Sequence, residues 1–423
     1  MRSYINVLAF GQVMFCAALA AQNAAPIPMI TPPPQAGPDQ RAEMTLPVPY
    51  QVLPDNRVTF RLKAAPEATS VKVVGEWPGG LGGRSTIPMV KGDQGIWSAT
   101  VGPLQSDVWS YSFSVDGATV LPSFGGMENT PILPVTDFVI PGPYGSDFAP
   151  HGAPRGSVTY VHVPFMGATK DIEVFLPAGY FENPTKRYPV LYLTMGGAGL
   201  PGNGGGENPE FVMLENMIAS GRAVPMIAVT FSPTAPGGDS DGWSPFAGGG
   251  NRTNERYVMS AQAISDEVVP WIDRAFRTIA DRDHRAIGGF SSAGAQGFLA
   301  GAKNPEKFAN IFTFSGGYAT WPGVGIQIQS KLDPKNFSGP DFNRVADMQK
   351  LGAMIPKLNG SANMKLVALY CGTSEPLIQT HELLKKFLDE RGVKYIATEN
   401  PGYTHEGRNV RVSLHDLVTK IFK

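Results

Sequence analysis

The chain has 423 residues, more than one hydrophobic core usually accommodates, so we expect two domains. Its 35 basic and 36 acidic side chains leave a formal net charge of −1, which excludes an extended basic surface for nucleic acid or acidic lipid. Glycine (49 residues) and proline (38 residues) are abundant, as is typical of loop-rich globular proteins.

The first 21 residues have the pattern of a secretory signal peptide. Arg2 supplies a positive charge, residues 5–19 are largely apolar, and Ala18-Leu19-Ala20 fits a small-x-small cleavage site. The apolar run is short for a membrane span, so we expect a secreted or periplasmic protein without a stable membrane anchor; an uncleaved anchor is the alternative. Cleavage would leave Cys371 as the single cysteine, and hence no intramolecular disulfide.

Residues 22–48 are rich in proline and are predicted to form an extended linker. From 49 to 145 the pattern changes to short segments in which polar and apolar residues alternate. Such segments, separated by turn residues, predict a small immunoglobulin-like β-sandwich. The predicted strands are 57–62, 70–77, 95–101 and 108–115.

Four aromatic residues of this predicted sandwich allow two interpretations. Trp77, Trp97, Trp109 and Tyr111 are suited to a platform on which sugar rings stack. Their period-two alternation with polar residues instead favours the buried core of the sandwich, which is the interpretation we prefer.

From 150 to 423 apolar strands alternate with amphipathic helices, which predicts a doubly wound, mostly parallel sheet. Such sheets collect ligands at the carboxyl ends of their strands. The predicted strands are 158–163, 171–176, 190–194, 226–231, 286–290, 311–314, 365–371 and 394–398, and the predicted helices include 209–220, 255–276, 377–391 and 409–422.

Ser291 lies at a sharp corner between a predicted strand and a predicted helix. The surrounding residues are Gly289-Phe290-Ser291-Ser292-Ala293-Gly294, and the small residues let the helix pack closely on the strand. This is the nucleophile elbow of an α/β-hydrolase, with Ala293 in place of the second glycine of Gly-x-Ser-x-Gly. The alternative is an ordinary turn serine.

Two further residues complete a catalytic triad in the chain order serine, acid, histidine. Glu375 follows the strand 365–371, and His405 lies on the loop after the strand 394–398. The imidazole would accept the serine proton, and the carboxylate would orient the imidazole. For Glu375 the alternative is a solvated loop carboxylate. The competing histidines, which we expect to be surface or capping residues, are His151, His162, His284, His381 and His415.

An oxyanion hole needs two backbone N–H donors. We expect one from Ser292, directly after the nucleophile, and one from Gly197 in the glycine-containing loop after the strand 190–194. The alternative is that this loop is only a flexible turn. We expect no cofactor and no metal. Asp239 and Asp241 lie together in a glycine-rich loop without histidine or cysteine partners, which is a weak pattern for a metal site.

In these motifs the chain resembles the esterase D type enzymes, above all the feruloyl and xylan acetyl esterases of carbohydrate esterase family one. The β-rich region is similar to the glycogen-binding-like, immunoglobulin-like module that precedes many of them. The resemblance covers about residues 45–423. The segments that carry it are 188–197 (YPVLYLTMGG), 216–229, 280–294, 371–377 and the His405 loop, together with 52–61 and 75–77 in the β-rich region.

The resemblance implies hydrolysis of hydroxycinnamoyl or acetyl esters on plant-wall polysaccharide, through an acyl-serine intermediate and without a metal. The chain departs from the family pattern in ways that imply a remodelled acyl pocket: Met195 replaces the histidine that begins the oxyanion loop, Glu375 replaces an aspartate, Ser292-Ala293-Gly294 replaces Met-Gly-Gly, and Glu406-Gly407-Arg408 follows His405 where an aromatic residue is usual. The alternatives are a siderophore (catecholate) esterase and a carbohydrate-binding protein with an inactive hydrolase domain.

Overall fold

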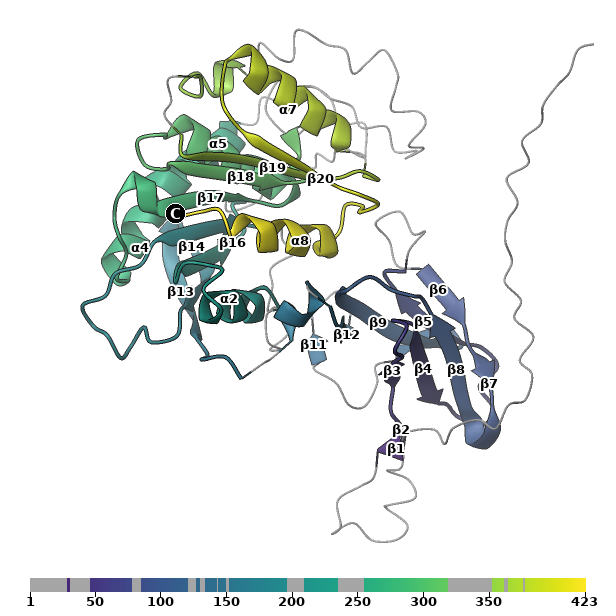
Figure 1. Ribbon diagram of the computed structural model, residues 1–423. Coiled ribbons are helices and arrows are strands. Elements are labelled where there is room, and N and C mark those ends of the chain that lie inside the picture. The colour runs from purple at the N-terminus through teal and green to yellow at the C-terminus, as the bar shows by residue number, and fades with distance from the viewer. Residues whose placement is uncertain are drawn as a thin grey trace, which may run out of the picture.

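The computed structural model contains an N-terminal β-rich part and a larger part built around one long sheet, which lie side by side (Figure 1). The structure describes residues 29–30, 46–77, 85–120, 127–129, 134–142, 144–149, 152–195, 209–234, 255–318, 352–360, 364–375 and 377–423. The predicted signal peptide, 1–21, lies outside these residues. Within the predicted linker, β1(Met29–Ile30) pairs with β2(Leu46–Pro47).

The N-terminal part, which we call the β module, consists of two antiparallel sheets. One sheet has the order β3-β4-β8-β7, and the other has the order β11-β12-β9-β5-β6, with β10 pairing to β9. The expected antiparallel β domain is therefore confirmed. Its strands are β3(Tyr50–Val52), β4(Val58–Lys63), β5(Val71–Gly75), β6(Ser85–Pro88), β7(Val90–Lys91), β8(Ile96–Val101), β9(Asp107–Val115), β10(Ala118–Val120), β11(Met127–Asn129) and β12(Pro134–Ile140).

The aromatic residues of the β module form its core. Trp109 and Tyr111 have no exposed surface, and Trp77 and Trp97 are 4% and 8% exposed. Their rings pack with Phe60 between the two sheets, as the alternating sequence pattern predicted. None of these four rings is available as a sugar-stacking platform.

The second part is organised around an eight-stranded sheet with the order β13-β14-β16-β15-β17-β18-β19-β20. β14 pairs antiparallel with both β13 and β16, and the strands from β16 to β20 are parallel. The expected mostly parallel α/β-hydrolase sheet is confirmed. Its strands are β13(Ser157–Phe165), β14(Ala168–Leu176), β15(Val190–Thr194), β16(Ile227–Phe231), β17(Arg285–Gly289), β18(Asn310–Phe314), β19(Leu366–Gly372) and β20(Ile396–Asn400).

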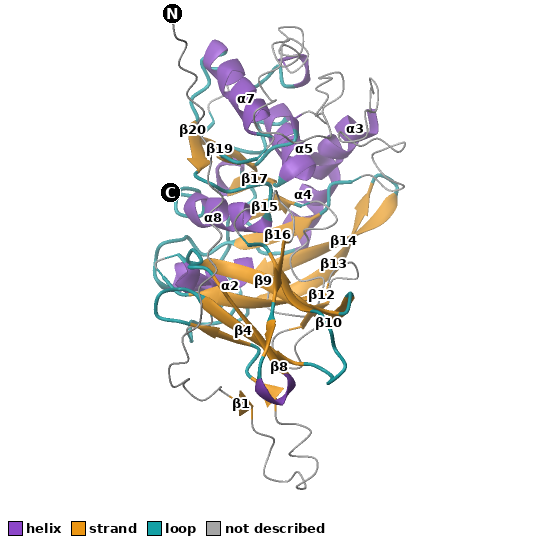
Figure 2. Ribbon diagram, turned by 90° about the vertical axis from the view of Figure 1, so that its right-hand side faces the viewer, coloured by secondary structure: helices purple, strands orange, loops and turns teal. Residues whose placement is uncertain are grey.

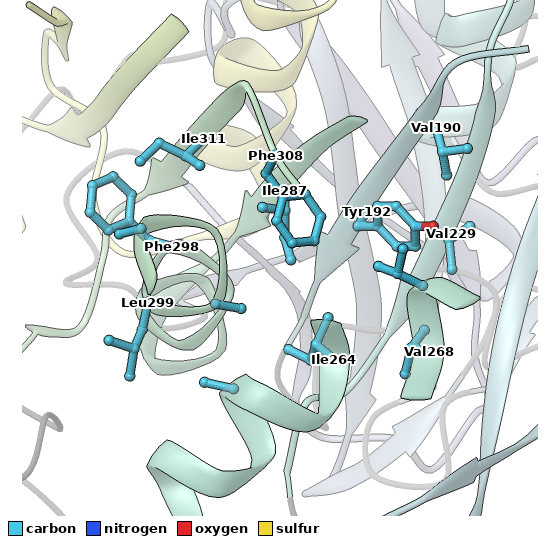
Figure 3. Packing of buried hydrophobic residues seen from close by; sticks show 14 of the residues in the cluster. Val190, Tyr192, Val229, Ile264, Val268, Ile287, Phe298, Leu299, Phe308 and Ile311 are labelled. Atoms are coloured by element: carbon cyan, nitrogen blue, oxygen red, sulfur yellow. The ribbon is translucent and has the colours of Figure 1, made fainter. Parts of the chain in front are cut away.

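Helices cover both faces of this sheet, because its central strands are apolar on both sides. One apolar cluster joins one face to α3(Glu255–Ala263), the π-helical η3(Ile264–Val268), α4(Val269–Ala275), α5(Ser291–Lys303) and α7(Ile378–Glu390). Figure 3 shows the part of this cluster in which η3 and α5 pack on the strands. A second cluster joins the other face to α2(Pro209–Ala219) and α8(Gly407–Leu417), which lie on the opposite side of the sheet from α3, α4 and α5 (Figure 2).

The catalytic candidates follow from this topology, since parallel strands bring their carboxyl ends to the same edge of the sheet. Ser291, Glu375 and His405 lie two, three and five residues after the ends of β17, β19 and β20. Within the described ranges, no helix has both the length and the apolar content required of a membrane span.

Candidate active site

Ser291 occupies a strained corner between β17 and α5. Its φ angle is +58°, in the left-handed region that a non-glycine residue rarely adopts. The carbonyl of Ser291 accepts a hydrogen bond from the amide of Gly317 at 2.9 Å, which helps to hold the corner. Strain of this kind persists only where the surroundings fix it, and it is common at functional sites. The expected elbow geometry is present.

Two glycines allow close backbone contacts at this corner, Gly289 with the neighbouring strand β15 and Gly294 of α5 with the end of β17. A Cβ atom at Gly289 would lie 1.7 Å from the carbonyl oxygen of Thr194, and one at Gly294 would lie 2.1 Å from the carbonyl oxygen of Gly289. The close approach therefore falls at Gly294, one position later than the second glycine of the usual motif. Ala293 has room for its methyl group in a buried position.

The three residues predicted as a triad form one hydrogen-bonded chain. Ser291 Oγ lies 2.9 Å from His405 Nε2, and His405 Nδ1 lies 2.7 Å from Glu375 Oε2. A carboxylate can only accept, so Nδ1 carries a hydrogen, and in the neutral ring Nε2 is then free to accept the serine proton. This is the arrangement in which a serine hydroxyl is activated as a nucleophile.

His405 is additionally held by the ring that precedes the nucleophile. Phe290 stacks on the imidazole with ring centroids 4.5 Å apart and planes inclined by 26°. The His405 side chain keeps 28% of its surface exposed, whereas the Glu375 side chain has none. The acid is thus shielded from water while the base remains open to a substrate.

The second oxygen of Glu375 is fixed by a set of donors that the sequence did not reveal. Glu375 Oε1 accepts hydrogen bonds from the Gly372 amide at 2.6 Å and from Asn409 Nδ2 at 3.0 Å, and also from Ser315 Oγ. Ser315 follows β18 directly. It could therefore have been predicted as a site residue, because ligands and site residues gather at the carboxyl ends of the strands. Asn409 is the first residue of the predicted last helix, 409–422, and nothing in its local sequence marks it as a partner of Glu375.

Cys371 lies beside this network. Its Sγ donates to Glu375 Oε1 over 3.3 Å. Burial, reinforced by the charge of Glu375, raises the pKa of the thiol far above its ordinary value. A thiol that stays protonated is a poor nucleophile, so Cys371 supports the site as a weak donor only.

Of the two expected oxyanion donors, the structure describes Ser292. Ser292 is the second residue of α5, where a backbone amide has no partner inside the helix, and the positive end of the helix dipole points to the same region. The peptide that carries this N–H is held through the Ser291 carbonyl, which accepts from the Gly317 amide, and the hydroxyl of Tyr257 donates to the carbonyl of the next peptide, that of Ser292, at 2.9 Å. Gly197 lies outside the described residues. The Met195 amide donates to the carbonyl of Phe231.

The competing histidines that the structure describes each contact a carboxylate away from Ser291. His151 is outside the described residues, as are Asp239 and Asp241. The contacts are His162 with Asp171, His284 with Asp281, His381 with Glu399 and His415 with Asp147.

One of these histidines belongs to a group that has the side chains of a metal site. His381, Glu382 and Glu399 place one ligand atom each within 4.8 Å of one another. The ammonium of Lys385 lies 2.9 Å from both carboxylates, and its hydrogen bond is the main cause of the lowered pKa of Glu399. Lys385 thus supplies the positive charge that these carboxylates require, and we assign no metal to them.

Comparison with known proteins identifies the family. The family model named Esterase matches residues 164–388, more than half of the chain, including Ser291 and Glu375. The chain belongs to this Esterase family.

Two curated relatives share part of the chain. A stretch of 273 residues is 29% identical to an endo-1,4-beta-xylanase/feruloyl esterase of Xylanibacter ruminicola, covering 61% of this chain and 35% of that protein. A stretch of 160 residues is 30% identical to Esterase Rv1288 of Mycobacterium tuberculosis, covering 36% of this chain and 30% of that protein. The chain thus spans about a third of the length of the curated relatives that it matches.

Among solved structures, the enterobactin esterase FES of Shigella flexneri shares the fold of this chain. The TM-score is 0.56 at 16% identity, and the match covers 87% of this chain and 95% of the other. The match therefore extends beyond the part of the chain that contains the eight-stranded sheet.

Proposed function

We propose that this protein is a serine ester hydrolase that works through an acyl-serine intermediate. The observation that carries the proposal is the continuous hydrogen-bonded chain from Ser291 through His405 to Glu375. These two hydrogen bonds also favour an active enzyme over the alternative of a carbohydrate-binding protein with an inactive hydrolase domain.

The geometry supports the following acylation step. Ser291 Oγ attacks the ester carbonyl carbon while His405 Nε2 takes up the hydroxyl proton, and the carbonyl electrons move onto the oxygen. The amide of Ser292 stabilises that oxyanion, together with a second donor that we assign to Gly197. When the tetrahedral intermediate collapses, Nε2 returns the proton to the leaving alcohol and the acyl group remains on Ser291.

Water then repeats the sequence in deacylation. His405 Nε2 takes a proton from water as the water oxygen attacks the acyl carbon, and it gives the proton back to Ser291 Oγ as the carboxylic acid leaves. Throughout both steps the buried carboxylate of Glu375 keeps the ring in one orientation and stabilises the imidazolium. The free enzyme is regenerated without any further reactant.

For the substrate we propose hydroxycinnamoyl (feruloyl) or acetyl esters of plant-wall polysaccharide such as xylan. The support is the 29% identity to a protein named as a xylanase/feruloyl esterase, together with the sequence motifs around Ser291 and His405. We further propose export to the periplasm or the medium, which rests on the signal-peptide pattern of residues 1–21 and would bring the enzyme to such a polymer.

A second candidate substrate is a catecholate siderophore ester. It is favoured by the fold shared with the enterobactin esterase over 87% of this chain, which extends the likeness beyond the hydrolase part. At 16% identity the likeness concerns the fold, so we rank this substrate below the plant-wall esters.

The test is turnover by the wild type and by Ser291→Ala on p-nitrophenyl acetate, methyl ferulate and a catecholate ester of serine. We expect the variant to lose at least about 10³-fold in kcat on every ester, because the nucleophile is absent. Equal turnover by the two proteins would overturn the serine-esterase mechanism. A kcat/KM for the catecholate ester above those for the other two esters would reverse the order of the substrates.

A further inference from the structure

The β module contacts α8, the helix that follows the loop carrying His405. α8 begins two residues after His405, and it lies at the side of the hydrolase part where the β module packs (Figure 1). Two arginines of α8, Arg408 and Arg411, reach strand β9 of the module. The segment after His405, where the sequence departs from the family pattern, therefore lies at the contact between the two parts.

Arg411 anchors the helix to the module. Its Nε lies 3.2 Å from Asp107 Oδ1, and its Nη2 donates to the carbonyl of Val108 at 2.6 Å. Both side chains of this ion pair are buried. Because separating a buried pair leaves an unpaired charge in an apolar setting, the start of β9 and the middle of α8 are held together firmly.

Arg408 connects the module to the loop itself. Its guanidinium carbon lies 4.0 Å from the centre of the Trp109 ring, and the indole is fixed by a hydrogen bond from Nε1 to the Gln105 carbonyl. On its other side, Arg408 Nη2 lies 2.6 Å from Glu406 Oε1, in an ion pair of which less than a tenth of each side chain is exposed. A desolvated guanidinium over an indole is among the stronger cation–π contacts.

The last contact of this series reaches the peptide before the histidine. Glu406 Oε1 also accepts from the amide of Thr404 at 3.3 Å. Glu406 and Thr404 are the two neighbours of His405, so one carboxylate ties the backbone on both sides of the base. That carboxylate is held by Arg408, which rests on Trp109.

We propose that Trp109 of the β module is a positioning residue for the esterase reaction, holding His405 in place through Arg408 and Glu406. The inference rests on the proposed function, because it assigns the base to His405. A general base must stay within hydrogen-bond reach of the proton it takes, and small displacements of such a group lower kcat strongly. A displacement confined to the base predicts a lower kcat with little change in KM.

The experiment compares full-length variants on p-nitrophenyl acetate. Trp109→Leu removes the ring under Arg408, and Trp109→Phe restores an aromatic face. Trp97→Leu is the matched control: Trp97 is buried in the same module and has its own cation, Lys91, 5.6 Å from the ring, away from α8. Melting temperatures of all variants separate loss of stability from loss of positioning.

We expect Trp109→Leu to lower kcat about tenfold with KM changed less than twofold, and Trp109→Phe to recover most of the loss. Trp97→Leu should lower the melting temperature and keep the wild-type kcat. Equal kcat values for Trp109→Leu and Trp97→Leu, whether both high or both low, would overturn the proposal.

A second variant keeps the test decisive if Trp109→Leu does not fold. Glu406→Gln removes the ion pair with Arg408 and should also lower kcat with little change in KM; a wild-type kcat would contradict the proposal. Failure of the proposed function looks different, because Ser291→Ala would then be as active as the wild type. An inactive Ser291→Ala beside a fully active Trp109→Leu would refute the positioning role alone.

Discussion

Asn409 Nδ2 donates a hydrogen bond to Glu375 Oε1 over 3.0 Å, and thereby joins the final helix to the acid of the triad. Asn409 Nδ2 also donates to Ser315 Oγ at 2.9 Å, and Asn409 Oδ1 accepts a hydrogen bond from Asn400 Nδ2. The triad carboxylate is thus embedded in a network drawn from the ends of three strands and from α8. Such a network orients a buried charge more tightly than one donor alone.

Replacing Asn409 by alanine should lower kcat by about 10- to 100-fold, since a hydrogen bond to a charged group contributes about 1.5–3 kcal/mol. Steady-state kinetics on p-nitrophenyl acetate measure the effect. Ser413→Ala is the control: Ser413 is buried and contacts Asn400 and the Asn409 carbonyl, without a contact to Glu375. An Asn409→Ala variant with the kcat of Ser413→Ala would show that the amide does not serve the carboxylate.

Shortening the acid should harm this enzyme, although aspartate is the usual residue in its family pattern. In Glu375→Asp one methylene is lost, so the carboxylate cannot keep both the 2.7 Å contact to His405 and the 2.6 Å contact to the Gly372 amide. We expect kcat to fall by at least about tenfold and KM to change little. The measurement is a kcat and KM determination at one pH, and a variant as fast as the wild type would mean that the loop adjusts freely.

The elbow predicts losses of stability of different size for two neighbouring substitutions. Gly294→Ala places a methyl group 2.1 Å from the carbonyl oxygen of Gly289, so the strand and the helix must separate and the melting temperature should fall by several degrees. Ala293→Gly should cost only about 1 kcal/mol, the usual difference in helix propensity. Thermal unfolding followed by circular dichroism distinguishes them, and equal melting temperatures would contradict the assigned packing.

Asp107 should give the protein a recognisable pH dependence. Burial raises the pKa of this carboxyl from 3.8 to about 6, against the opposing charge of Arg411. Between these two values the folded protein holds a proton that the unfolded chain releases, so the contribution of Asp107 to stability is present below 3.8 and is lost as the pH rises through about 6.

The comparison is with Asp107→Asn, which does not titrate. Urea unfolding at a series of pH values should show the stability of the wild type falling relative to the variant between pH 4 and pH 6. Parallel stability curves for the two proteins over this range would refute the raised pKa.

Much of this site could be predicted from the sequence, because its signals are local. The apolar strands and the small residues around Ser291 indicate the elbow directly, and the strand order then places Glu375 and His405 at the same edge of the sheet. The alternating aromatics of the β module were likewise sufficient to predict a core, since period two alone separates buried from exposed positions.

The remaining features depend on contacts between distant segments. Asn409 and Ser315 reach Glu375 only because β18, β19 and α8 pack together, and a single asparagine or serine carries no sign of such a partner. Arg408 departs from the family pattern near His405, and the sequence gives no reason for it. The reason is its contact with the Trp109 ring, about 300 residues away in the chain.

The buried pair of Asp107 and Arg411 also bears on how this protein melts. Unfolding of either the β module or the hydrolase part removes the partner of a charged side chain in the other part. We therefore expect the two parts to unfold together. Heating should accordingly give one calorimetric peak for the whole chain, and an engineer who wished to shorten the enzyme would first have to redesign the face of the last helix.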